Sequence, residues 1–172
     1  MANNKLIVQL SAGRIKRYHT HPIVGEQTVG DHTYGVVQIL RYITQDNCSK
    51  NLMIAALDHD VLEFFTGDVP HPAKNMFPQL KQVLDAIERN AAEVNGMVEY
   101  DKLSAKEKVL LTCADLLEMG FYGAYQMKLG NSFGRNVVET IVQSVGKLPE
   151  NKVPKEAKDL AQELEEMLNV GK

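Results

Sequence analysis

Two histidines and two aspartates occupy parts of the sequence where polar groups are costly to bury. His59 and Asp60 follow the apolar run 52–57, Asp115 stands inside the apolar segment 110–117, and His32 precedes a further apolar stretch. A buried carboxylate is destabilising unless it is paired or bound to a cation. If these four side chains converge, they offer two imidazole nitrogens and two carboxylates to one metal ion.

This set of donors restricts the metal without choosing it. Imidazole and carboxylate together suit divalent Zn, Co, Mn, Fe or Mg. Four protein ligands on an octahedral ion leave positions for water and a phosphate oxygen, and such an ion lowers the pKa of water and polarises phosphorus. A His-Asp pair is a weak signal by itself, and single histidines in apolar helices are more often core residues. The pattern across successive helices favours a divalent metal site.

Glu63 is the candidate acid or base. It follows His59 by four residues, which places both side chains on one face if a helix continues through them. A carboxyl group beside a metal could transfer a proton during hydrolysis. The alternative is a surface ion pair. Asp58 points about 100° away from His59 on such a helix and is not included.

Four further residues could bind a substrate. Arg17 suits recognition of a phosphate by two hydrogen bonds, and Lys74 could also reach a phosphate. Asp68 lies in a loop and could accept a hydrogen bond from a sugar hydroxyl, while Tyr18 offers an aromatic face to a base or sugar. For each of them an unliganded loop residue is an equally good interpretation.

Composition limits the classes of protein. The chain has 172 residues with 44% hydrophobic and 24% charged side chains, which predicts a single globular domain over residues 1–172. A net charge of -3 argues against binding polymeric nucleic acid. Two cysteines, Cys48 and Cys113, cannot form a thiolate zinc cage. No apolar run approaches the roughly 20 residues of a membrane span, so we expect a cytoplasmic protein without membrane contact.

Hydrophobic periodicity predicts helices throughout the chain. Asp31 is expected to cap one, Ser49 another, and Ser104 with Glu107 forms a capping-box pattern. Thr66-Gly67-Asp68-Val69-Pro70-His71-Pro72 reads as a loop, and Gly96 ends a helix. No alternating strand pattern is present, so the expected fold is an all-α, single-domain compact helical bundle. The expected helices span residues 5–17, 31–43, 51–65, 77–94, 104–127, 137–145 and 156–170.

Longer motifs add a resemblance. They are Arg17-Tyr18, the segment Gln27-Thr28-Val29-Gly30-Asp31-His32, the block 59–74 that runs from His-Asp through Thr-Gly-Asp-x-Pro to Lys, and Ala114-Asp115. With these motifs the chain resembles the HD-domain nucleotide phosphohydrolases, and in particular 5'-deoxynucleotidases of the YfbR type and phage dATP triphosphohydrolases of the DatZ type. The 5'-deoxynucleotidase has Trp where Tyr18 stands, a departure that bears on base or sugar selectivity.

The resemblance implies a role for each residue. His32, His59, Asp60 and Asp115 would hold the catalytic metal, and Glu63 would work with the attacking water. Arg17 and Lys74 would bind phosphate, while Tyr18 and Asp68 would contact the nucleoside. The metal would be Zn, Co, Mn or Mg.

The resemblance also ranks the functions. The first is release of deoxyadenosine and triphosphate from dATP, and the second is hydrolysis of deoxynucleoside monophosphates. A non-catalytic nucleotide-binding module needs the pocket without Glu63. Cyclic-nucleotide phosphodiesterases use extra histidines, for which His71 between two prolines is a poor candidate. The family further implies a homo-oligomer, located in the host cytoplasm if the chain comes from a phage.

Overall fold

The computed structural model describes residues 4–96 and 102–169, and its regular elements are all helices. An isolated bridge between Lys16 and Thr28 adds a short extended contact. The all-α expectation is therefore confirmed. The helices are α1 (Asn4–Ala12), α2 (Val29–Ile43), α3 (Lys50–Asp58), α4 (Glu63–Thr66), α5 (His71–Met76), α6 (Pro78–Asn95), α7 (Ala105–Lys128), α8 (Phe133–Gly146) and α9 (Lys155–Asn169).

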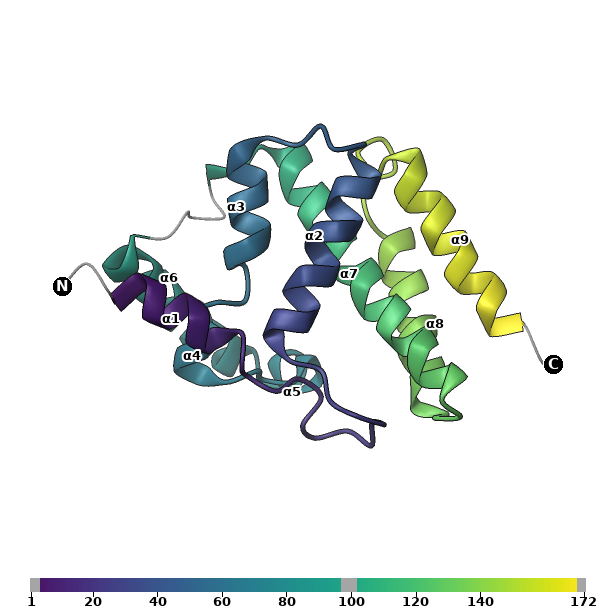
Figure 1. Ribbon diagram of the computed structural model, residues 1–172, viewed down its shortest axis with the longest axis horizontal. Helices are drawn as coiled ribbons and strands as arrows, with labels where there is room; N and C mark the ends of the chain where they lie inside the picture. Colours follow the sequence, from purple (N-terminus) through teal and green to yellow (C-terminus); the bar gives the residue numbers. More distant parts are fainter. Residues whose placement is uncertain (1–3, 97–101, 170–172) are drawn as a thin grey trace.

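Helices α2 and α7 lie side by side in the middle of the bundle (Figure 1). On one side α7 packs against α8 and α9, and on the other α3 packs against α2 and α7. Helices α1, α4 and α6 gather at the end of the molecule remote from α9, and α5 lies below α2 in this view (Figure 1). The long connection between α1 and α2 runs along the lower edge of the bundle in this view.

The main core fills the space between α2, α3, α7, α8 and α9. Its fully buried side chains include Leu40, Leu52, Leu117, Val138 and Leu164. A second, smaller apolar cluster joins α1, the turn after α3, and α6; it contains Val8, Ala12, Val61 and Ala92. Helices α2 and α7 contribute to the main core and also carry buried polar side chains, among them His32 and Glu118.

Glycines set the spacing of the helices around α7. A Cβ atom on Gly134 would lie 2.3 Å from the carbonyl oxygen of Gly123, so α7 and α8 touch backbone to backbone there. A Cβ atom on Gly120 would lie 2.6 Å from Leu164 Cδ1, which lets α9 approach. Position 134 therefore requires glycine, because its close neighbour is backbone, whereas a side chain at position 120 would require Leu164 to shift.

Local capping explains where several helices begin. Ser104 and Glu107 form the predicted capping box of α7, and the Ser49 side chain caps α3 by accepting from the amide of Leu52. The prediction that Asp31 caps α2 is wrong. Thr28 is the N-cap, and Asp31 is the third helical residue whose carboxylate accepts from the Thr28 amide.

The first predicted helix, 5–17, is too long, because α1 ends at Ala12. After Gly13 the backbone finds partners elsewhere. Val29 donates to the Ile15 carbonyl at 2.8 Å, and Gly30 donates to the Gly13 carbonyl at 3.1 Å. These bonds tie the residues after α1 to the start of α2 and replace the helical ladder.

The predicted helix 51–65 is also interrupted. Helix α3 ends at Asp58, and His59 Nδ1 donates to the Ala56 carbonyl at 2.8 Å. In a continued α-helix that carbonyl would accept from the amide of Asp60. The side chain therefore takes the backbone acceptor, and a turn carries the chain from His59 to α4.

None of the described helices is long and apolar enough to cross a membrane. The expected end of the last helix at Val170 lies outside the described residues.

Exposed apolar side chains, among them Leu6, Leu10, Val83 and Ile87, lie on α1 and α6. The homo-oligomer stays a prediction.

The glycine contact between α7 and α8 leads to the first testable prediction. Gly134→Ala should lower the free energy of unfolding by about 1–3 kcal/mol, because the new methyl group meets the Gly123 carbonyl. Gly146→Ala is the matched control on α8: nothing lies within 4 Å of its added Cβ, and alanine favours the helix. Urea unfolding of both variants measures the difference, and equal stabilities would contradict the backbone contact.

Candidate metal centre

Four side chains from three parts of the chain meet between α2 and α7. His32 Nε2 on α2 lies 3.1 Å from Asp115 Oδ1 on α7 and 3.2 Å from His59 Nε2 in the turn after α3. Asp60 Oδ2 lies 3.5 Å from both imidazole Nε2 atoms. The nearest ligand atoms of His32, His59 and Asp115 all lie within 4.8 Å of one another. The sequence-predicted ligand residues are thus brought together.

Each imidazole is oriented by its other ring nitrogen. His59 Nδ1 donates to the Ala56 carbonyl, and a carbonyl can only accept, so the Nε2 lone pair is directed toward the cluster. His32 is fully buried, and its Nδ1 is hydrogen-bonded to a carboxylate oxygen of Glu118. Both Nε2 atoms therefore face the two aspartates, the arrangement that binding of one cation by two neutral histidines needs.

The electrostatics of the cluster also fit a cation. Burial disfavours the ionised form of Asp115, but His32, His59 and Arg17 outweigh it and lower its pKa to about 2. Burial likewise disfavours the protonated form of His32, but Asp115 and Glu118 outweigh it and raise its pKa to about 9. The carboxylates thus favour a positive charge between them, and a divalent ion would compete with the His32 proton for that place.

Arg17 lies against this cluster. Its guanidinium is buried and donates from one terminal nitrogen to Asp60 Oδ2 at 2.6 Å. Burial opposes its charge, but Asp60 and Asp115 outweigh that effect and raise the pKa of Arg17. Arg17 Nε is buried and has no hydrogen-bond partner among the described residues. One donor of the guanidinium is therefore left for an anion.

Glu63 begins α4 close to the same cluster. It is 8% exposed, and its Oε2 atom has no hydrogen-bond partner within residues 4–96 and 102–169. Burial raises the pKa of Glu63 to about 8, with Asp60 and Asp68 adding to the rise and Arg17 and Lys74 opposing it. A buried carboxyl group that titrates near neutral pH is suited to proton transfer.

Tyr18 follows Arg17 with a backbone φ of 54°, a conformation that is strained for a tyrosine. One face of its ring stacks on Tyr122 of α7 at a centroid distance of 5.0 Å and an interplanar angle of 17°. The same ring makes edge contacts with His21 and Phe133, at centroid distances of 6.0 Å and 6.3 Å. The Tyr18 hydroxyl is buried without a hydrogen-bond partner in the described part of the chain.

Asp68 and Lys74 lie on the α4–α5 side of the site. Asp68 is half-buried between α4 and α5, and Lys74 is half-buried on α5. Both act electrostatically on Glu63, in opposite directions. Every residue that the sequence analysis selected therefore lies at or near one site.

Sequence reasoning did not select three residues that contact the site: Glu118, Gln27 and Tyr122. Glu118 is 9% exposed and binds His32, and Gln27 Nε2 donates to Glu118 Oε1 at 2.9 Å. The signal in the sequence was the spacing of three residues from Asp115, which puts Glu118 on the same helical face. An isolated Glu on a helix usually indicates a solvated surface, so this signal was weak.

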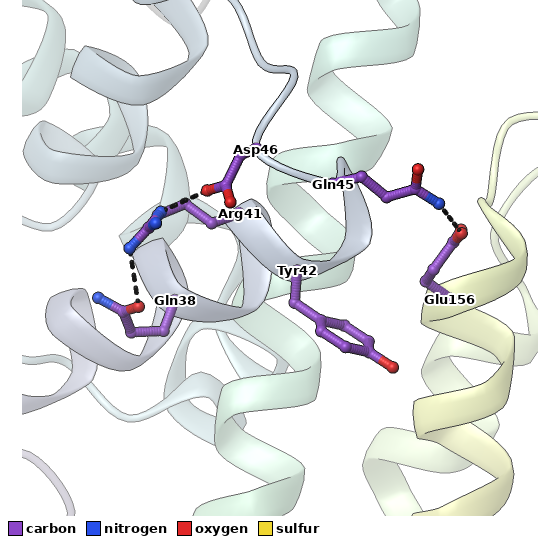
Figure 2. Close-up of a pocket in the computed structure, with 6 residues that line it drawn as sticks. All are labelled: Gln38, Arg41, Tyr42, Gln45, Asp46 and Glu156. Carbon is purple, nitrogen blue, oxygen red and sulfur yellow. Dashed lines mark hydrogen bonds and ion pairs between the residues drawn. The ribbon is translucent and has the colours of Figure 1, made fainter.

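A separate shallow pocket lies at the other end of α2 (Figure 2). Its lining residues already pair with one another: Arg41 donates to Asp46 at 2.7 Å, and Gln45 donates to Glu156 of α9 at 2.6 Å. These contacts tie the end of α2 to α9. The pocket contains none of the residues that the sequence analysis selected.

Comparison with known proteins gives a family match. The model of the family described as 5'-deoxynucleotidase YfbR-like matches residues 6–164. The 5'-deoxynucleotidase PM0747 of Pasteurella multocida is 30% identical over 94 residues, which cover 46% of this chain and 48% of that protein. The matched region therefore spans about half the length of this curated relative.

Two solved structures have a similar fold. The HD phosphohydrolase DatZ of cyanophage S-2L, bound to dA and one catalytic Zn²⁺ ion, superposes with a TM-score of 0.68 at 19% identity, over 95% of each chain. The PH0347 protein of Pyrococcus horikoshii superposes with a TM-score of 0.74 at 18% identity, over 95% of this chain and 98% of that one. At these identities the likeness establishes the fold, and the expected HD-domain fold is confirmed.

The raised pKa of Glu63 leads to a prediction about stability in metal-free protein. The folded chain holds the Glu63 proton up to a pH of about 8, whereas an unfolded glutamate releases it near the ordinary pKa of 4.5. Between these values the Glu63 contribution to the free energy of unfolding should fall by up to roughly 1.4 kcal/mol per pH unit. Glu63→Gln should remove this decrease, so the variant gains stability relative to wild type as the pH rises.

Chemical unfolding in EDTA at pH 5 and pH 8 measures this effect. The wild-type chain and the Glu63→Gln variant are compared at each pH, so titrations common to both cancel. A stability difference that is the same at both pH values would show that Glu63 ionises in the folded chain as it does in the unfolded one.

Proposed function

The chain belongs to the YfbR-like 5'-deoxynucleotidase family of metal-dependent HD-domain phosphohydrolases, and on this basis we propose that it hydrolyses deoxynucleoside 5'-monophosphates. The products are the deoxynucleoside and inorganic phosphate. The observation that carries the proposal is the convergence of two imidazoles and two carboxylates beside a buried Arg17 and a buried Glu63.

In this proposal His32, His59, Asp60 and Asp115 hold the divalent cation. Their donor atoms come from α2, the turn after α3, and α7, so the folded bundle preorganises them. A divalent cation at this place supplies Lewis acidity, which makes water more acidic and phosphorus more electrophilic. Zn, Co, Mn and Mg all accept this donor set.

Arg17 and Lys74 bind the phosphate group. Arg17 is held in place by Asp60, and its unpartnered Nε supports the assignment. A guanidinium fixed in this way orients an anion at little cost in conformational entropy. Lys74 adds a positive charge from α5, on the side of the site where Glu63 lies.

Tyr18 and Asp68 contact the nucleoside. Tyr18 packs against the base or the sugar with the part of its ring that does not stack on Tyr122. Asp68 accepts a hydrogen bond from the sugar and favours deoxyribose. A tryptophan at the position of Tyr18 would present a larger ring face. The smaller ring of Tyr18 therefore affects which base or sugar fits against it.

Glu63 moves the proton that the reaction requires. Water adds to phosphorus and loses a proton, while the bond between phosphorus and O5' breaks and O5' gains one. A buried carboxyl group with an unpartnered oxygen can exchange this proton without first giving up another contact.

A second candidate is hydrolysis of dATP to deoxyadenosine and triphosphate. It is supported by the likeness in fold to DatZ, whose structure holds dA. The family match favours the monophosphate.

A substrate assay tests both candidates. We expect purified protein with Mn²⁺, Co²⁺, Zn²⁺ or Mg²⁺ to release phosphate from dAMP faster than from AMP. Release of triphosphate from dATP should be slower than release of phosphate from dAMP. Glu63→Gln should lower kcat by about 10²–10⁴-fold, the usual contribution of a proton-transfer group.

Metal binding is measured on the same samples as a control. Glu63→Gln should retain the bound metal, because Glu63 is not a proposed ligand. If neither dAMP nor dATP is hydrolysed with any of the four metals, the proposed reaction is wrong. If triphosphate release from dATP dominates, the second candidate replaces the first.

A further inference from the structure

Glu118 is a buried carboxylate that none of the proposed roles uses. It lies on α7 one helical turn after Asp115 and is 9% exposed. A buried ionisable group is costly unless its contacts are specific, so its partners indicate its purpose.

Both oxygens of Glu118 are occupied, and each faces α2 or the segment before it. Oε2 is bonded to His32 Nδ1, and Oε1 accepts from Gln27 Nε2 at 2.9 Å. Gln27 is itself 4% exposed. The Gln27 amide thus holds the Glu118 carboxylate so that it points at His32 Nδ1. The other ring nitrogen, His32 Nε2, faces the proposed metal ligands.

The backbone of α2 leaves room for this carboxylate. A Cβ atom on Gly35 would lie 2.6 Å from Glu118 Cγ and 3.1 Å from Glu118 Oε1. Gly35 follows His32 by three residues, so both are on the face of α2 that meets α7. Any side chain at position 35 would push Glu118 away from the imidazole.

We propose that Glu118 is a positioning residue that holds His32 in the tautomer and ring orientation required for metal binding, and that Gly35 is glycine in order to admit it. A proton on Nδ1 leaves the Nε2 lone pair for the cation, and the neighbouring carboxylate makes that lone pair more basic. A purely structural ion pair would not require Nε2 to face His59, Asp60 and Asp115 at the same time. The inference rests on the proposed role of His32 as a ligand.

The test measures metal binding directly. Zn²⁺ affinity is determined by competition with a chromophoric chelator, and the coordination geometry is followed by the visible absorption of bound Co²⁺. Glu118→Ala should weaken Zn²⁺ binding about 10–100-fold and change the Co²⁺ spectrum. Gly35→Ala should change both measurements in the same direction, because its methyl group displaces the carboxylate.

Glu118→Gln is the conservative variant and should recover most of the affinity. Its carbonyl oxygen can still accept from His32 Nδ1. Its new amide needs an acceptor, and Gln27 Oε1, buried without a hydrogen-bond partner in the described residues, becomes that acceptor when the Gln27 amide rotates.

Val138→Ala is the control for a general loss of stability. Val138 is fully buried on α8, which contributes none of the proposed ligands. This variant should melt at a lower temperature and keep the wild-type Zn²⁺ affinity and Co²⁺ spectrum.

His32→Ala separates failure of the inference from failure of the metal site. If it binds Zn²⁺ as tightly as wild type, the proposed site itself is wrong. If it loses Zn²⁺ while Glu118→Ala binds as tightly as wild type, only the positioning role is overturned. A Co²⁺ spectrum that changes equally in Val138→Ala and Glu118→Ala would also overturn it.

Discussion

The site depends on one fully buried imidazole whose two nitrogens both meet carboxylates. His32 has no exposed surface, yet Glu118 lies at its Nδ1 atom and Asp115 at its Nε2 atom. Such a group is stable in the interior only if α2 and α7 stay in register, because a small shift would leave charges buried without partners. The core on the α8–α9 side and the glycine contacts hold that register.

The segment between α1 and α2 also depends on α7. Its Arg17 and Tyr18 must stand over the cluster although the segment has no helix of its own. Two features of the fold hold it: the backbone bond from Arg17 to the Gln27 carbonyl at 2.8 Å, and the side chain of Gln126 on α7, which binds both the amide and the carbonyl of Val24. Helix α7 thus positions the proposed metal ligand Asp115 and the loop that would receive the substrate.

The centre combines features that oppose stability. It contains a carboxyl group with an unpartnered oxygen at Glu63, a strained backbone at Tyr18 and several carboxylates in one small volume. Such features persist only when the surrounding packing overdetermines them, and they are typical of sites selected for chemistry. The two apolar clusters supply that packing; they include Ala114 beside Asp115 and Val61 beside Asp60.

Much of this protein follows from the sequence by itself. Apolar spacing determined the helical class, and the capping box at Ser104 and Glu107 located the start of α7. Polar residues in apolar surroundings selected the candidate ligands, whereas the roles of Arg17, Tyr18, Asp68 and Lys74 came from the resemblance to a family. Each is a local signal, readable over a few residues. Tertiary structure decided the rest: α3 ends at Asp58, where the His59 side chain bonds the Ala56 carbonyl, and Glu118 is recognisable only when α7 lies against α2. Those outcomes depend on contacts between residues far apart in the chain, and no local pattern encodes which distant groups will meet.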